Sequence, residues 1–150
     1  METKYLIEGP ITQKVISKLL AKTGERSDTG GHSVFIGQVR ADEVNGKKVK
    51  SIEYSAYKEM VKIEADKIKN AVFMEFTDVK SIDFLHSTGI VHAGKISLFV
   101  LVSAGHRRQS IEACSKTVEF IKEKLPVWKK EIFDDKSHKW KQNDSAQTGS

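Results

Sequence analysis

The sequence has a single cysteine, Cys114, and no run of about 18 apolar residues. One cysteine excludes an internal disulfide framework and a zinc site built on several cysteines. Without a long apolar run, no segment is expected to span a membrane. The first ten residues carry charges inside a short apolar patch, and no signal-peptide core follows, so a cytoplasmic location is expected.

Signatures of several enzyme classes are also missing. The sequence has no P-loop and no GxGxxG motif, and Ser103 has no nucleophile-elbow context. His86 and His92 have no cysteine or carboxylate at ligand spacing, which argues against a metal site. Cys114 falls on an apolar helical stripe, which favours a buried core thiol over a nucleophile.

The 150 residues carry a net charge of +5, and 39% of them are hydrophobic. This length and composition predict one domain, residues 1–140, with a single core. Residues 141–150 are polar and are expected to form a disordered tail. The positive charge favours anionic partners, namely phosphate compounds, an acidic protein or nucleic acid.

Hydrophobic periodicity predicts an alternation of helices and strands. A helix is expected after Pro10, and a second helix over residues 58–76. Asn45-Gly46 is a turn signal that returns the chain into a strand. Strands are expected at about 33–40, 49–57, 79–86, 96–105 and 127–133, with 96–105 as the central one.

The last helix has the clearest pattern. Its apolar stripe steps by three and four residues through Ile111, Cys114, Val118, Ile121 and Leu125. Pro126 ends it, because proline lacks an N–H and restricts the residue before it. Together, these elements predict an α+β fold in which helices pack on a mostly antiparallel sheet.

The stretch KEKLPVWKKE, residues 122–131, contains the first candidate site. Lys122 borders the buried stripe, while the extended chain after Pro126 puts Lys129 on the face opposite Trp128, which is expected to pack on the core. Desolvation and a neighbouring cation both lower a lysine pKa, so two converging lysines suit acid–base chemistry and anion binding. The alternative is an ordinary basic surface with a lysine at a helix C-terminus.

Two further segments carry candidate anion ligands. SAGHRR, residues 103–108, is a strand-to-helix turn, where free N–H groups, His106 and Arg107 suit a phosphate. GQVR, residues 37–40, places Arg40 at a strand end, where it can point into a cleft. In both segments the alternative is an exposed polar surface.

Taken together, FIGQVR, EYSAY, VLVSAGHR and IKEKLPVWKKE resemble, in order and spacing, the large, catalytic subunit of molybdopterin synthase. The resemblance covers residues 33–140. It implies the fold called an α/β hammerhead and a sulfurtransferase that acts in molybdenum cofactor biosynthesis. In that family, sulfur arrives as a thiocarboxylate on the Gly-Gly tail of a small ubiquitin-like subunit. The enzyme transfers it to cyclic pyranopterin monophosphate and forms the dithiolene of molybdopterin.

The resemblance also implies the site and the partners. Its two key lysines correspond to Lys122 and Lys129, which we expect to be catalytic. The residues expected to contact substrate are Gln38, Val39, Arg40, His106, Arg107, Lys122, Lys129, Lys130 and Glu131. The family forms a homodimer with one small subunit at each distal end, a heterotetramer. No metal or other cofactor is implied for this step. The resemblance further predicts that Arg40, His106 and Lys122 share one pocket.

Three positions depart from the family pattern. Ser87 stands where relatives usually have an arginine, so contacts made by that arginine are not expected here. Gly105 replaces a residue that is often alanine or proline, which loosens the turn. The C-terminal tail also diverges, so its contacts cannot be transferred.

Two other classes of protein remain as alternatives. Lysines interleaved with Trp128 and Trp140 are typical of a small RNA-binding module, although no RNP-type strand or GXXG loop accompanies them. The second alternative is a catalytically silent scaffold that only docks a ubiquitin-like tail. Retention of both Lys122 and Lys129 argues against the scaffold.

Overall fold

The computed structural model describes residues 4–141 of the chain. In chain order the elements are β1 (Leu6–Glu8), α1 (Gln13–Ala21), a 3₁₀ helix η1 (Lys22–Glu25), β2 (Gly31–Gln38), β3 (Glu43–Val44), β4 (Lys47–Ala56), α2 (Lys58–Glu75), β5 (Val79–His92), β6 (Ile96–Ala104), α3 (Arg107–Lys124), β7 (Val127–Phe133) and β8 (His138–Lys141). None of the described helices is long and apolar enough to cross a membrane.

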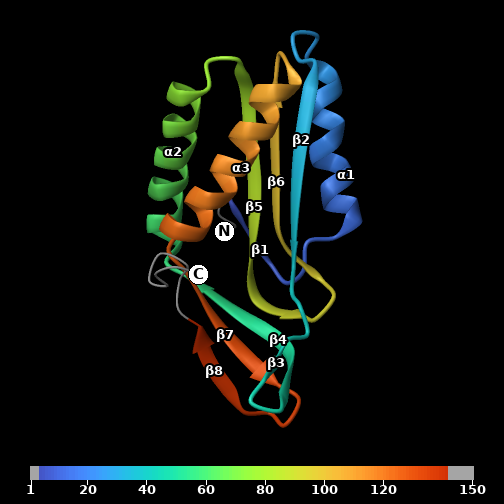
Figure 1. Ribbon diagram of the computed structural model, residues 1–150, viewed down its shortest axis with the longest axis vertical. Coiled ribbons are helices and arrows are strands. Elements are labelled where there is room, and N and C mark those ends of the chain that lie inside the picture. Colours follow the sequence, from blue (N-terminus) through green and yellow to red (C-terminus); the bar gives the residue numbers. More distant parts are fainter. Residues whose placement is uncertain (1–3, 142–150) are drawn as a thin grey trace.

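The strands form a sheet in the order β2-β6-β5-β4-β7-β8 (Figure 1). All pairs are antiparallel except β1, which runs parallel to β5, and β3 pairs only with β4. The long strand β5 pairs with β6 up to His86 and, from Gly89 onward, with β4. Gly89 has a φ of +76°, a conformation that glycine adopts without steric cost. β5 therefore joins the two parts of the sheet.

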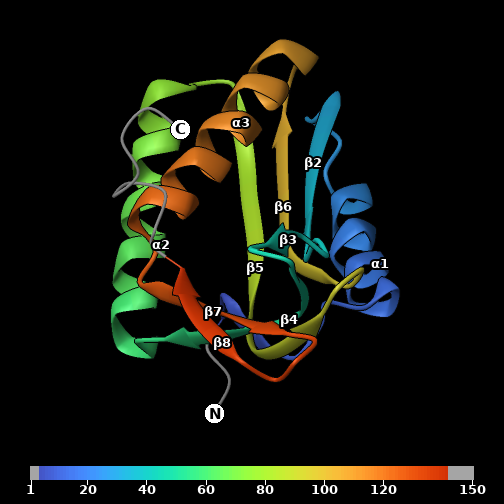
Figure 2. The same cartoon turned by 60° about the horizontal axis from the view of Figure 1, so that its bottom comes forward.

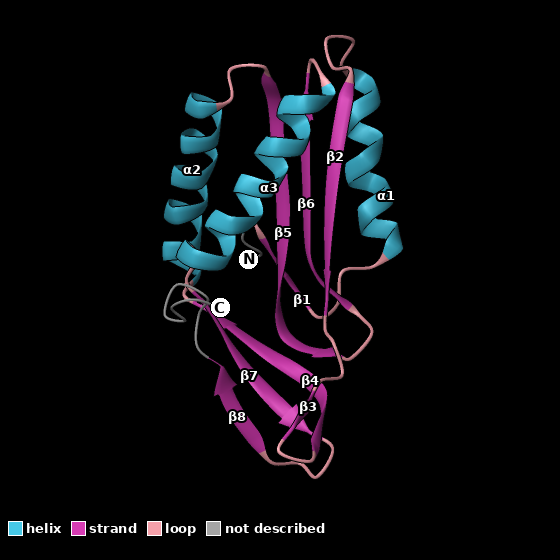
Figure 3. Ribbon diagram, viewed as in Figure 1, coloured by secondary structure: helices cyan, strands magenta, loops and turns pink. Residues whose placement is uncertain are grey.

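Helices cover both faces of the part of the sheet that contains β5 and β6 (Figures 2 and 3). Side chains alternate along β6, so Leu98, Val100 and Val102 enter the main core, which α2 and α3 cover. Phe99 and Leu101 point the other way and pack with α1. This arrangement confirms the expected α+β fold of helices on a mostly antiparallel sheet.

The turn and capping signals act as expected. Asn45 and Gly46 both have positive φ, as a two-residue hairpin turn requires, and they join β3 to β4. The N–H of Val15 donates to Thr12 Oγ1, which caps α1. The helix α3 ends at Lys124, and Leu125 is already extended before Pro126. The chain then enters β7, beside β4.

The strand β4 pairs with β5 and β7, and β2 pairs with β6. Two details differ from the expectations. Trp128 does not pack on the core but is 44% exposed, because β7 buries Val127 on the opposite face. Ile111 is also exposed, although it continues the apolar stripe of α3. The expected tail lies outside the described residues except for Lys141, which ends β8.

Candidate active site

A pocket of about 300 Å³ opens where the end of β2, the last turn of α3 and the strand β7 meet. Its lining contains three lysines, an arginine and two carboxylates, which come from distant parts of the sequence. The full lining is Phe35, Ile36, Gly37, Gln38, Val39, Arg40, Asp42, Ile52, Tyr54, Ser97, Lys122, Lys129, Glu131 and Lys141.

Lys122 and Lys129 reach the pocket from the two sides of Pro126. Lys122 follows the buried Ile121 in the last turn of α3, and Lys129 lies opposite Tyr54 in the pairing of β7 with β4. Both lysines also line a second, smaller pocket that adjoins the first, with His86 in its wall. The helix C-terminus favours a cation at Lys122, because its free carbonyl groups carry partial negative charge.

Arg40 stands at the mouth of the pocket, just beyond a register shift at the end of β2. Its Nε donates to Asp42 Oδ1 at 2.5 Å, and the rest of its side chain is largely exposed. The hydrogen bond and the negative charge of Asp42 raise the pKa of Arg40. A fixed guanidinium at a pocket mouth is suited to an oxyanion such as phosphate.

His86 is a buried part of this site that the sequence analysis considered only as a metal ligand. Its Nδ1 lies 2.8 Å from the carbonyl oxygen of Ser87, and because a carbonyl only accepts, Nδ1 carries the proton. Burial, together with the charges of Lys129 and Lys122, lowers the pKa of His86 to about 4, although the bond to Ser87 opposes this. His86 is therefore neutral beside the two lysines.

Tyr54 and Ser97 were also not anticipated. The Tyr54 hydroxyl donates to Ser97 Oγ at 3.1 Å, and its ring meets the His86 ring edge-on, with centroids 5.1 Å apart. Burial raises the pKa of Tyr54, so the hydroxyl keeps its proton. The alternation of strand residues was the available signal, since it places Tyr54 and His86 on inward faces.

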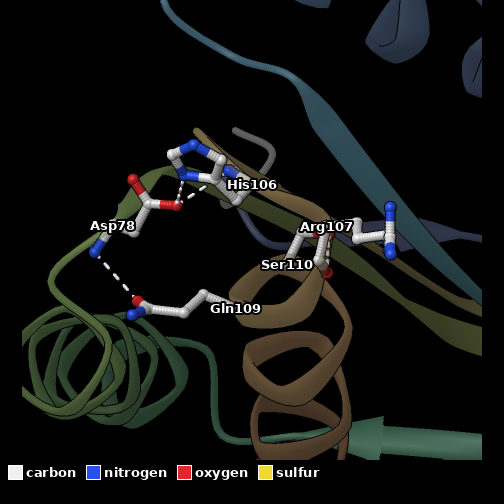
Figure 4. Close-up of polar contacts among 5 residues, drawn as sticks. All are labelled: Asp78, His106, Arg107, Gln109 and Ser110. Atoms are coloured by element: carbon white, nitrogen blue, oxygen red, sulfur yellow. Dashed lines mark hydrogen bonds and ion pairs between the residues drawn. The ribbon is translucent and has the colours of Figure 1, made fainter.

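His106 and Arg107 do not line this pocket, so the expectation that Arg40, His106 and Lys122 share a pocket within one chain is wrong. The pair begins α3, whereas Lys122 lies in its last turn, 16 residues on, or about 24 Å along the axis. His106 instead contacts Asp78, and the Arg107 side chain extends away from it (Figure 4).

Lys130 also lies outside the pocket. The alternation of β7 turns it to the face opposite Lys129, where its ammonium is 3.1 Å from Glu53 and 5.3 Å from the centre of the Trp140 ring. Of the expected site residues, the structure brings together Gln38, Val39, Arg40, Lys122, Lys129 and Glu131.

The chain matches the family model described as "MoaE protein" over residues 7–124. It is 40% identical over 109 residues to the molybdopterin synthase catalytic subunit of Pyrococcus abyssi, which covers 73% of this chain and 72% of that protein. This chain belongs to the MoaE family.

Other relatives are longer. The catalytic subunit of Rattus norvegicus is 36% identical over 93% of this chain, and the match covers 64% of that protein. The catalytic subunit of Drosophila melanogaster is 36% identical over 95% of this chain, and the match covers 38% of that protein. Among solved structures, molybdopterin synthase from Staphylococcus aureus matches with a TM-score of 0.82 and 26% identity, over 95% of this chain and 99% of that chain. A complex of subunits 1 and 2 of the molybdopterin-converting factor from Helicobacter pylori shares the fold, with a TM-score of 0.76 and 20% identity over 94% and 91% of the two chains.

In residues 4–141, no group of three or more histidine, cysteine or acidic side chains is arranged to hold a metal ion. Cys114 is a buried residue of α3, and burial raises the pKa of its thiol. The groups that these two pockets offer for chemistry are their lysines, Arg40, Glu131 and the neutral Tyr54 and His86.

Proposed function

We propose that this chain is the catalytic subunit of a molybdopterin synthase, a sulfurtransferase of molybdenum cofactor biosynthesis. It transfers sulfur from the thiocarboxylated C-terminus of a small ubiquitin-like subunit to cyclic pyranopterin monophosphate. This transfer forms the dithiolene group of molybdopterin. The observation that carries the proposal is the single pocket formed by Lys122, Lys129 and Arg40, because phosphate and thiocarboxylate are both anions. Relatives in the MoaE family carry the name of this subunit.

The geometry suggests a division of roles within the pocket. Lys122, held at the end of a rigid helix, is the acid–base or electrostatic catalyst: it stabilises the oxygen that leaves the cyclic phosphate and moves protons as sulfur adds and water departs. Lys129, on the facing strand, holds the tail carboxyl and the substrate. Arg40 holds the phosphate, and Gln38, Val39 and Glu131 shape the rest of the pocket.

The small subunit is the first proposed partner. A flexible Gly-Gly tail with an anionic end fits a basic pocket that opens to the surface, and the positive charge of the chain steers an acidic partner toward it. The name of the Helicobacter pylori neighbour describes a complex between two such subunits.

A second copy of this chain is the other proposed partner, and β2 is the surface that suits it. Within the described residues, the outer edge of β2 has no strand beside it, and its central residues Val34, Phe35 and Ile36 are exposed. A mostly apolar hollow of about 450 Å³ lies between them and α3, next to Ile111. Exposed apolar edge strands are sites of association, and antiparallel pairing of two β2 strands is self-complementary.

Such a dimer explains how His106 and Arg107, which lie far from the pocket of their own chain, reach a substrate. Pairing centred between Val34 and Phe35 sets Gly31 of one chain opposite Gln38 of its partner. Arg107 packs on Gly31, since a Cβ built there lies 2.9 Å from the Arg107 Cα. The pair then lies beside the pocket of the other chain, where both residues can contact the substrate.

We further propose that residues 1–140 form one domain and that the protein is cytoplasmic.

The function is tested by combining the chain with a thiocarboxylated small subunit and cyclic pyranopterin monophosphate and measuring molybdopterin. Product is expected only with the thiocarboxylate and not with the same subunit bearing a plain carboxylate. Absence of product, with a partner shown to be active with another catalytic subunit, contradicts the proposal.

A further inference from the structure

Asp78 ties the turn between α2 and β5 to the first residues of α3 (Figure 4). Its Oδ2 accepts from the backbone N–H of His106 at 2.8 Å and lies 3.1 Å from Nδ1 of the His106 ring. Its carbonyl oxygen accepts from the N–H of Gly105 at 3.0 Å, and its own N–H donates to Gln109 Oε1 at 2.9 Å. Four contacts thus hold one aspartate against one helix start.

Gly105 is part of this arrangement. A Cβ built on Gly105 lies 2.5 Å from Asp78 Oδ1, a distance that real Cβ atoms essentially never show, and 3.1 Å from its carboxyl carbon. Any larger residue at position 105 therefore displaces the carboxylate from His106. The glycine and the aspartate therefore act together.

The contact determines which nitrogen of His106 is available. An ionised carboxylate only accepts, so Nδ1 carries a proton and donates it to Asp78. Burial of the Asp78 carboxyl opposes its ionisation, but hydrogen bonds from the His106 ring and backbone outweigh this and lower its pKa, so the carboxylate is ionised at neutral pH. The His106 side chain is 88% exposed, and its Nε2 is left for a ligand.

We infer that Asp78 is a positioning residue that fixes the ring orientation and tautomer of His106 and so presents Nε2, as the acceptor of a hydrogen bond or a proton, to the substrate in the neighbouring chain. The inference rests on the proposed function, in which His106 contacts substrate across the β2 interface. It adds a residue that does not touch substrate itself. Carboxylates that orient functional histidines act in this way at other sites.

The first test is independent of turnover. Long-range ¹⁵N–¹H spectra of the imidazole groups, with His106 assigned through His106→Gln, report which ring nitrogen carries the proton at pH 8. The wild type is expected to show protonated Nδ1 and unprotonated Nε2, and Asp78→Asn to show a mixture of the two tautomers. Protonation at Nε2 in the wild type, or an unchanged tautomer in Asp78→Asn, overturns the inference.

The second test separates positioning from folding. Asp78→Asn is expected to raise KM for the cyclic precursor about tenfold and to change kcat less. Gly105→Ala retains the carboxylate but moves it away, and the same effect is expected. Glu75→Gln removes an exposed carboxylate three residues before Asp78 and serves as the control, with KM unchanged.

Thermal unfolding of each variant identifies any loss of fold. If Asp78→Asn does not fold, Gly105→Ala decides the question, and a wild-type KM in a folded Gly105→Ala overturns the inference. If the wild type forms no product, the proposed function fails, while the tautomer spectra still decide whether Asp78 orients His106.

Discussion

Lys122 and Lys129 line the same two pockets from opposite sides of Pro126, one from the last turn of α3 and one from the facing strand β7. The proline ends the helix and lets the chain reverse beside β4, so two lysines seven residues apart in sequence line the same pocket. The neutral His86 lies beside them. This relationship is the basis of the predictions that follow.

Lys129 and Lys130 form a matched pair for mutagenesis. They are adjacent in sequence, but only Lys129 lines the pocket, while Lys130 contacts Glu53 on the other face. Lys129→Ala is expected to lower the rate of molybdopterin formation about a hundredfold, whereas Lys130→Ala stays within about threefold of the wild type. Equal losses in the two variants would show that the face of β7 does not decide function.

A mixed dimer tests whether the site is shared between chains. Lys122→Ala and His106→Ala are each expected to be strongly impaired. Refolding an equal mixture restores one intact site in each mixed dimer, so activity returns to about a quarter of the wild-type value. No recovery, with mixed dimers demonstrated by differently tagged chains, argues that both residues serve the same chain's pocket or that His106 has no role.

The pH dependence of stability reports on His86. Its pKa is lowered to about 4 in the folded chain from an ordinary 6.5, so below pH 6.5 the unfolded chain binds more protons than the folded one. The contribution of neutral His86 to the free energy of unfolding is fully present above pH 6.5 and is lost as the pH falls toward 4. At pH 5 the loss is roughly 2 kcal/mol.

Urea unfolding at pH 8 and pH 5 measures this loss. His86→Gln is expected to lose about 2 kcal/mol less than the wild type between the two pH values. His92→Gln, a change at an exposed position near the end of the same strand, serves as the control and should behave as the wild type does. A His86→Gln variant with the wild-type pH dependence would show that His86 is not held neutral.

Ser87 offers a stability test at a buried position. Its hydroxyl oxygen is the buried side-chain polar atom that has no hydrogen-bond partner among residues 4–141. Ser87→Ala is therefore expected to raise the free energy of unfolding by about 1 kcal/mol. Ser103→Ala is the contrast, because it removes a 2.7 Å contact with His32 and should destabilise. Urea titration distinguishes the two, and a destabilised Ser87→Ala contradicts the expectation.

Local signals predicted much of the fold. The apolar stripe ending at Pro126, the Asn45-Gly46 turn and the run of residues 96–105 each depend on neighbours in sequence, and α3, the β3–β4 hairpin and the buried strand β6 follow from them. The strand β6 is not central, however, because it lies next to the edge strand β2. Strand pairing depends on contacts between distant segments, so the pairing of β2 with β6 was not predictable from these patterns.

Lys122, Lys129 and Arg40, which both local pattern and resemblance indicated, line one pocket, and so do Gln38, Val39 and Glu131, which the resemblance alone indicated. His86 and Tyr54 look like ordinary strand residues until the fold places them beside the lysines. The separation of His106 from Lys122 is set by the length of α3. The RNA-binding alternative depended on a basic segment that β7 divides between two faces, with Lys129 on one and Lys130 on the other.

The central claim is that the chemistry takes place at Lys122, and its most direct test compares molybdopterin formed by the wild type and by Lys122→Ala. Both are supplied with thiocarboxylated small subunit and cyclic precursor at saturating concentrations, and folding is verified by thermal unfolding. Product from the wild type and a loss of at least about a hundredfold in Lys122→Ala is the predicted result. Equal rates from the two proteins would contradict it and reduce KEKLPVWKKE to a docking surface.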